Sequence, residues 1–284
     1  MMADKMATRK AYGETLVELG AENPDLVVMD ADLSKSTMTA EFGKKYPERF
    51  FNMGIAEQNL YGAAAGLALS GKVVCASTFA MFAAGRAFEI IRNSIGYTRA
   101  NVKICATHSG ITVGEDGASH QTFEDIALMR TIPGMTVINP SDGVSAGKLI
   151  RQAVAFNGPC YVRLGRAAVP VFYGEDSEIT LGKGNLIREG RDVTVIATGI
   201  MVSEAAAAAE KLAEDGIDVR VIDMHTIKPL DEEIIIKAAE ETGAIVTAEE
   251  HSVIGGLGSA VAEVVVRNHP VKMSMVGQKD TYGE

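Results

Sequence analysis

Short, continuous apolar runs alternate with helical patterns along most of this 284-residue chain, and this alternation restricts the fold more than any other feature. The runs lack the polar alternation of a strand that has one face in water, so both faces of each strand should be buried. Strands of that kind belong to a parallel sheet that is covered by helices on both sides. The sequence therefore predicts an α/β fold. The expected strands are residues 26–29, 72–76, 102–106, 135–138, 161–164, 193–197, 219–222 and 244–248.

The alternation breaks once, between Ala167 and Gly190. This stretch contains Pro170, several glycines and charges of both signs, and it has no long periodic run. Such composition is typical of a connection between domains. We expect residues 1–170 to form one parallel-sheet α/β domain and residues 191–284 to form a second, smaller one. Residues 171–190 are expected to be a linker with at most one strand of its own.

The composition excludes several classes of protein. The net charge of −10, from 27 basic and 37 acidic residues, argues against non-specific binding to nucleic acid, which needs clustered positive charge. No apolar run reaches the roughly 18 residues of a membrane span, and the first ten residues do not resemble a signal peptide. Cys75, Cys105 and Cys160 are too widely separated for a disulfide framework or a zinc site. We therefore expect a cytoplasmic protein.

Polar and aromatic residues follow several of the expected strands directly. Asp30 and Asp32 come after the first strand, residues 77–79 come after the second, and His108 comes after the third. Ligands of open parallel sheets bind outside the carboxyl ends of the strands. The sequence thus predicts a ligand site at this edge of the first sheet.

Glu57 stands at the start of an expected helix that is rich in alanine, leucine and glycine. A carboxylate in this position has two interpretations. It stabilises the helix through the macrodipole, or it is buried in a site where it needs a hydrogen-bond partner or a proton. The residues alone leave both interpretations open.

His108 and His120 flank a glycine-rich loop that contains Glu115 and Asp116. Two histidines beside an acidic residue can move protons near neutral pH. They can also bind a metal, although no third nearby histidine or cysteine completes a ligand set, or they can be ordinary loop residues. The glycine spacing in this loop does not match a dinucleotide-binding fingerprint.

Three motifs together resemble the pyrimidine-binding half of transketolase. They are Met53-Gly-Ile-Ala-Glu-Gln-Asn59, Thr78-Phe-Ala-Met-Phe82 and Gly114-Glu-Asp-Gly-Ala-Ser-His-Gln121. The resemblance extends over residues 9–166, and the second unit is similar to the C-terminal domain of that family, with weaker motifs. It implies a thiamine diphosphate enzyme that transfers a two-carbon ketol unit from a ketose phosphate to an aldose phosphate.

The resemblance also assigns roles around the cofactor. It implies that Glu57 hydrogen-bonds a nitrogen of the pyrimidine ring and so allows the cofactor's amino group to act as a base. Phe79 corresponds to the aromatic face under the pyrimidine, with Phe82 behind it. Leu33 corresponds to a side chain that supports the bent cofactor, and Asp32 faces the thiazolium ring.

The remaining roles concern the sugar substrates. The resemblance implies that His108 and His120 are catalytic histidines that contact substrate oxygens, and that Asp116 contacts a substrate hydroxyl. It further implies a phosphate-binding clamp made by Arg9, Ser36 and Arg166. The alternative for the two arginines is that they form ordinary surface ion pairs, which contribute little.

One departure from the family concerns the metal site. The family binds the diphosphate and its Mg²⁺ through a Gly-Asp-Gly motif, and this chain contains no such triplet. The resemblance is therefore to the C-terminal subunit of a split transketolase. It implies that the metal ligands lie on an N-terminal partner subunit, with none on this chain, in an α₂β₂ heterotetramer. The alternatives are a deoxyxylulose-phosphate synthase-like enzyme, the β subunit of a 2-oxo acid dehydrogenase, and a non-catalytic assembly subunit.

Overall fold

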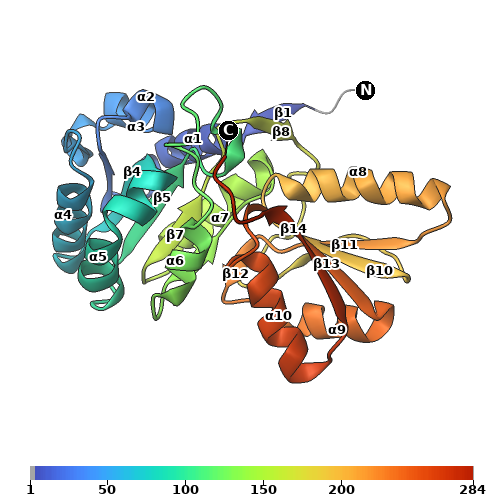
Figure 1. Cartoon of the computed structure of the whole chain (residues 1–284). Coiled ribbons are helices and arrows are strands. Elements are labelled where there is room, and N and C mark those ends of the chain that lie inside the picture. Colours follow the sequence, from blue (N-terminus) through green and yellow to red (C-terminus); the bar gives the residue numbers. More distant parts are fainter. Residues whose placement is uncertain (1–3, 284) are drawn as a thin grey trace.

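The computed structural model describes residues 4–283, which form two α/β domains side by side (Figure 1). The first sheet has the strand order β12-β6-β7-β5-β4-β2-β3. All strands from the first domain run parallel in it, which confirms the predicted fold class. Their bounds are β2 (Leu26–Asp30), β3 (Phe50–Asn52), β4 (Val73–Phe79), β5 (Val102–Thr107), β6 (Thr136–Ile138) and β7 (Cys160–Arg163).

Strand β2 shows why these strands read as continuous apolar runs. Every residue of β2 is buried, and its side chains alternate between two hydrophobic clusters. Leu26 and Val28 pack with residues of α1 (Thr8–Glu22) and α7 (Gly143–Ala155), whereas Val27 and Met29 pack with residues of α4 (Glu57–Leu69). Each face of the sheet is therefore covered by helices, as the lack of polar alternation predicts.

Shorter helical segments complete the first domain. Residues 82–96 contain the π-helical turns η2 and η3 with one α-helical turn, α5, between them. The bounds of these segments are α2 (Ser34–Thr37), α3 (Ala40–Lys45), η1 (Pro47–Arg49), η2 (Phe82–Arg86), α5 (Phe88–Ile90), η3 (Ile91–Gly96), η4 (Ile111–Val113) and α6 (Asp125–Thr131). Across residues 4–283, no helix is long and apolar enough to cross a membrane.

The second sheet has the order β14-β13-β10-β11-β9, in which β9 alone is antiparallel to its neighbour. Its strands are β9 (Asn185–Arg188), β10 (Val193–Ala197), β11 (Val219–Asp223), β13 (Ala244–Ser252) and β14 (Lys272–Gln278). The helices of this domain are α8 (Met201–Glu214), α9 (Glu232–Thr242) and α10 (Leu257–Asn268).

The two halves of the chain are joined more closely than the sequence predicts. Strand β9 lies inside the expected linker, residues 171–190, yet it pairs with β11 in the second sheet. Strand β12 (Thr226–Lys228) follows β11 in the chain but pairs antiparallel with β6, at the edge of the first sheet. These strands are short and lie at sheet edges, so they have no extended periodic pattern to reveal them. The hydrophobic cluster that contains α4 continues into the second domain.

At the start of the connection, β8 (Ala168–Pro170) pairs antiparallel with β1 (Lys5–Ala7). This two-stranded ribbon brings the first described residues beside the end of the first domain. It also places Arg9, at the start of α1, close to Arg166, which lies two residues before β8 in the chain.

Candidate active site

The site predicted from the sequence lies at the carboxyl ends of β2, β4 and β5. Phe79 is the last residue of β4, and its ring stacks on the His108 imidazole with 3.9 Å between centroids. Phe82 stacks on the other side at 6.1 Å from Phe79, and His120 lies edge-on to Phe82 at 5.3 Å. The structure therefore brings together two aromatic rings and two histidines from three separate segments of sequence.

The two phenylalanines differ in exposure from the sequence-based expectation. The family resemblance predicts that the Phe79 ring contacts the ligand and that Phe82 lies behind it. In the structure Phe79 is only 6% exposed and is covered by His108, whereas Phe82 is partly exposed. His108 has a positive φ of 57°, and its imidazole stacks on the Phe79 ring. Phe82 is therefore the ring with more surface left for a ligand.

Glu57 is the first residue of α4 and is only 3% exposed. Its carboxylate makes no hydrogen bond within residues 4–283, and its nearest cation is the Arg86 guanidinium at 3.6 Å, which is 58% exposed. Buried carboxylates normally have hydrogen-bond partners. Arg86 also lies over the Phe82 ring, 5.4 Å from its centroid. The Glu57 carboxylate, which has this one ion pair and no hydrogen bond among the described residues, therefore fits a ligand that presents a hydrogen-bonding ring nitrogen.

A buried carboxylate that the sequence analysis did not assign organises the loop after β2. Asp30 accepts hydrogen bonds from the Leu33 backbone N–H (2.5 Å), the Thr37 hydroxyl (2.6 Å) and the Thr39 hydroxyl (3.0 Å). Burial raises the pKa of Asp30, and these hydrogen bonds oppose that rise. Two threonines close after a strand-end aspartate are the sequence signal for this arrangement. The network fixes the loop that carries Asp32, Leu33 and Ser36.

Asp32 is exposed and has a left-handed backbone with φ of 66°. The Asn52 side chain holds it there, because its amide oxygen accepts from the Asp32 N–H and its amide nitrogen donates to the Asp32 carboxylate, both at 3.0 Å. Leu33, the next residue, is partly exposed. Both residues lie in the loop that follows β2, the strand that pairs with β4, which ends at Phe79.

His108 is buried and electrically neutral at neutral pH. Burial, together with the charges of Arg9 and Arg166, lowers its pKa to about 4. Its Nε2 lies 3.4 Å from Arg9 Nη1 and its Nδ1 lies 2.9 Å from the Thr107 hydroxyl. Because a guanidinium only donates, we assign the proton of the imidazole to Nδ1 and the acceptor lone pair to Nε2.

Arg9 and Arg166 come together at the rim of the site. Arg9 Nη1 donates to the Ser36 backbone carbonyl at 2.7 Å, and Arg166 Nη1 donates to the Val113 carbonyl at 2.9 Å. The pKa of Arg9 is lowered by burial and by the charge of Arg166. Neither guanidinium forms an ion pair with a carboxylate in the described part of the chain, so the surface ion-pair alternative has no support. Two adjacent cations without a counter-ion suit an anionic ligand.

Asp116 and His120 lie on the loop between β5 and α6. Asp116 is exposed and contributes to the electrostatic environment of His108. His120 is partly exposed, and its Nδ1 lies 3.0 Å from the Ser119 hydroxyl. Within residues 4–283 no group of three His, Cys, Asp or Glu side chains is arranged to hold a metal ion.

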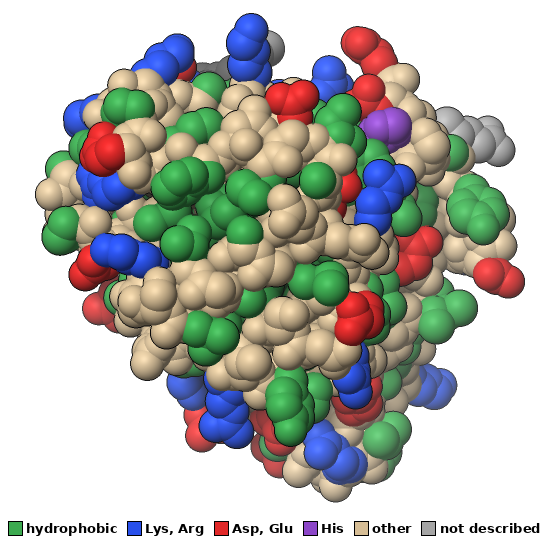
Figure 2. Space-filling model, turned by 90° about the vertical axis from the view of Figure 1, so that its left-hand side faces the viewer, with side chains coloured by type: hydrophobic (Ala, Val, Ile, Leu, Met, Phe, Trp, Pro, Cys, Tyr) green, Lys and Arg blue, Asp and Glu red, His purple; other side chains and the backbone are tan. Residues whose placement is uncertain are grey.

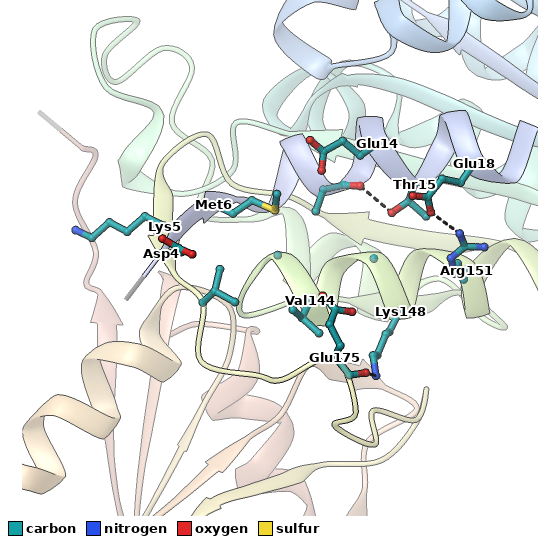
Figure 3. Close-up of a pocket in the computed structure, with 14 residues that line it drawn as sticks. Asp4, Lys5, Met6, Glu14, Thr15, Glu18, Val144, Lys148, Arg151 and Glu175 are labelled. Atoms are coloured by element: carbon teal, nitrogen blue, oxygen red, sulfur yellow. Dashed lines mark hydrogen bonds and ion pairs between the residues drawn. The ribbon is translucent and has the colours of Figure 1, made fainter. Parts of the chain in front are cut away.

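A separate cleft of about 450 Å³ lies between α1 and α7 (Figure 3). None of the residues discussed above lines it. Two of its cations already have partners, since Arg151 pairs with Glu18 and Glu22, and Lys148 donates to the backbone carbonyl of Glu175. The histidines and aromatic rings that meet at the sheet edge do not line this cleft.

Comparison with known proteins decides the family. A sequence model of the transketolase pyrimidine-binding domain matches residues 4–171, and one of the transketolase C-terminal domain matches residues 182–284. The chain belongs to the transketolase family. It is 55% identical over 278 residues to a "Putative transketolase C-terminal section" of Methanocaldococcus jannaschii, an alignment that covers 97% of this chain and 87% of that protein.

Other transketolase-family proteins are similar over the same length. The chain is 44% identical to a 6-deoxy-6-sulfo-D-fructose transketolase subunit of a Clostridium species, with 97% of this chain and 86% of that protein covered. A solved structure described as "Split gene transketolase, inactive beta4 tetramer" superposes with a TM-score of 0.90 at 56% identity. That match covers 96% of this chain and 90% of the solved one.

Family membership implies a transferase that uses thiamine diphosphate. The residues present fit its pyrimidine ring, because Glu57 offers an open buried carboxylate and Phe82 offers a partly exposed aromatic face. The same cannot be said of the diphosphate and its metal, because the described residues supply no cluster of side chains that could bind a metal ion.

Proposed function

We propose that this chain is the pyrimidine-binding subunit of a two-chain transketolase that transfers a ketol unit from a ketose phosphate to an aldose phosphate. The observation that carries the proposal is the buried, open carboxylate of Glu57 beside the aromatic wall of Phe79 and Phe82. The family resemblance supplies the reaction, and the site supplies groups of the right chemistry for it.

Thiamine diphosphate, when bound, supplies a carbon nucleophile that attacks the ketose carbonyl. Glu57 holds the pyrimidine by a hydrogen bond to a ring nitrogen, and the low-dielectric surroundings of the buried carboxylate make that bond strong. Phe82, which stacks on Phe79, would offer its partly exposed ring to the pyrimidine. Leu33 and Asp32, on the loop ordered by Asp30, would contact the rest of the cofactor.

The histidines handle protons of the sugar substrates. With its proton assigned to Nδ1, the neutral His108 has an acceptor at Nε2, and Arg9 Nη1 already lies 3.4 Å from that atom. A substrate hydroxyl would have to take the place of the Arg9 N–H before it could donate to Nε2. The low pKa of His108 makes it a weak base, which favours hydrogen bonding over lasting protonation. His120, which lies edge-on to the Phe82 ring, contacts another substrate oxygen, while Asp116 binds a hydroxyl.

The two guanidinium groups at the rim bind the substrate phosphate. Arg9 and Arg166 lie close enough to repel each other and lack a counter-ion among the described residues. A phosphate between them would relieve that repulsion through charge-assisted hydrogen bonds. Ser36 contributes to this clamp through its backbone carbonyl, which orients Arg9. Because a relative is named for a sulfonated sugar, a sulfonate is the alternative anion.

A partner chain completes the cofactor site. This chain has no Gly-Asp-Gly triplet, so the diphosphate and Mg²⁺ are bound by an N-terminal subunit that carries it, in an α₂β₂ assembly. Figure 2 shows that the face formed by α4 and α5 is mostly uncharged and hydrophobic across its centre. On α4, a side chain added at Gly62 or Gly66 would meet no atom within 4 Å, and Ile55 just before the helix is 79% exposed. This face suits close contact with another subunit.

Reconstitution tests the proposed function. The purified chain, with Mg²⁺ and thiamine diphosphate, is expected to show no ketol transfer from xylulose 5-phosphate. Addition of an N-terminal subunit that carries Gly-Asp-Gly is expected to produce the activity. Pyruvate, the donor expected for deoxyxylulose-phosphate synthase or a 2-oxo acid dehydrogenase, should not replace the sugar. Strong turnover by the single chain, or a preference for pyruvate, would show that the proposal is wrong.

A further inference from the structure

A carboxylate of the second domain contacts the loop that carries Asp116 and His120. Glu250 lies near the carboxyl end of β13, and its Oε1 accepts a hydrogen bond from the Thr112 backbone N–H at 2.7 Å. Thr112 belongs to the turn η4, only a few residues before Asp116. A side chain of the second domain thus binds the backbone of the loop that forms one wall of the site.

Glycine at position 110 makes this contact possible. A Cβ at Gly110 would lie 2.2 Å from the Glu250 carboxyl carbon and 2.5 Å from each of its oxygens. Its φ of 76° is also one that side-chain-bearing residues rarely adopt. The Glu250 carboxylate therefore lies directly against the first turn of the loop.

A buried arginine fixes Glu250 and the far end of the same loop together. Arg163 Nη2 donates to the Glu250 backbone carbonyl at 2.8 Å and to the Thr122 carbonyl at 3.4 Å. The Gly110 N–H donates to the same Thr122 carbonyl at 3.2 Å, which closes the neck of the loop. Arg163 itself is held by Asp125 at 2.8 Å. The loop is thus bound at its first turn and at its base by the same group of residues.

The turn that Glu250 holds also holds Arg166. Val113 follows Thr112 in η4, and its carbonyl accepts from Arg166 Nη1 at 2.9 Å. Displacement of the turn would therefore move both the loop and one arm of the proposed phosphate clamp. No step in this path depends on a direct contact between Glu250 and a substrate.

We propose that Glu250 is a positioning residue for ketol transfer, which fixes the η4 turn and thereby sets the places of loop 109–122 and of the Arg166 guanidinium. This inference rests on the proposed function for its catalytic consequence, although the attachment of the loop can be measured without any activity. It gives the second domain a defined part in the site of the first.

The test compares three variants in the reconstituted two-chain complex. Glu250→Ala removes the acceptor for Thr112, and Glu250→Gln keeps an acceptor oxygen in place. The matched control is Glu263→Ala, which removes an ion pair with Arg130 across the same domain boundary (2.9 Å) but leaves loop 109–122 untouched. Hydrogen–deuterium exchange of residues 109–122 and kcat/KM for a ketose phosphate are measured for each.

Glu250→Ala is expected to speed exchange of the loop amides and to lower kcat/KM by on the order of 10- to 100-fold, the scale of a small misplacement of reacting groups. Glu250→Gln should recover most of both properties, and Glu263→Ala should match the wild type. Unchanged loop exchange in Glu250→Ala would overturn the inference, as would an equal loosening in Glu263→Ala. Faster exchange with unchanged kcat/KM would also overturn it, because the loop would then be ordered without positioning the site. A wild-type complex without ketol transfer would instead refute the proposed function, while the exchange data still decide the attachment of the loop.

Discussion

Arg166→Ala tests the phosphate clamp most directly. Within the described residues Arg166 makes one hydrogen bond, to the Val113 carbonyl, and has no carboxylate partner. Its charge is therefore available to a substrate phosphate. A charge-assisted hydrogen bond contributes about 1.5–3 kcal/mol, and each 1.4 kcal/mol is roughly a factor of ten. The variant should raise KM for a ketose phosphate by about 10- to 100-fold, with a smaller effect on kcat, because uniform binding is lost.

The bond to Val113 complicates this measurement. Its loss frees the η4 turn and costs about 1.5–3 kcal/mol, because the donor is charged. That cost should affect every substrate alike, whereas loss of the clamp should affect only substrates with a phosphate. The informative quantity is therefore the ratio of the KM change for xylulose 5-phosphate to that for hydroxypyruvate, which has no phosphate.

The assay measures steady-state ketol transfer by the reconstituted complex with both donors. Arg151→Ala is a suitable control, since Arg151 is a partly exposed arginine that pairs with Glu18 and Glu22 on α1, away from the site. It should leave both KM values unchanged. Equal changes for the two donors in Arg166→Ala would mean that Arg166 only supports the loop, and no change for either would exclude it from substrate binding.

Three further predictions concern titratable side chains. Glu57→Gln should lower turnover by about 10²–10⁴-fold without impairing assembly with the partner; near-normal exchange of the thiazolium proton, followed by NMR, would instead show that Glu57 only stabilises its helix. His108, His225 and His251 each have a pKa lowered to about 4, mainly by burial. The unfolded chain takes up protons on these histidines at a higher pH than the folded protein does, so the free energy of unfolding should fall as pH drops from about 6.5 towards 4. Urea unfolding at stepwise lower pH should show a declining midpoint, and a flat profile would contradict this. Burial raises the pKa of Asp223 to about 7, so the folded state favours the protonated form of this carboxyl. The stabilisation of the folded state that this protonation provides is lost as pH rises through 7. Asp223→Asn should thus gain stability relative to the wild type between pH 6 and pH 8 by up to about 1.4 kcal/mol, and a loss over that range would refute the assignment.

The sequence predicted those features that depend on two-sided burial or on contiguous motifs. Strand β2 was predictable because each of its residues is buried, so no polar alternation interrupts it. The meeting of Phe79, His108 and Asp32 at one edge followed from parallel topology alone, because all three come at the ends of neighbouring strands.

Features that depend on side-chain direction or on the opposite domain were not predictable in the same way. The stacking of His108 on Phe79 depends on side-chain directions that no residue pattern reveals. Strand β12 has three residues, too few for any periodicity. Glu250 reads as one more charged residue at the end of a strand, and only the fold shows that it reaches Thr112, 138 positions earlier.

The placement of β12 also limits how the site can open. Because this strand belongs to the chain of the second domain but is hydrogen-bonded to β6, a hinge rotation of one domain against the other would break backbone pairs and the shared hydrophobic cluster. A movement that admits a ligand and keeps these pairs is therefore confined to smaller segments, such as the exposed residues around Asp116.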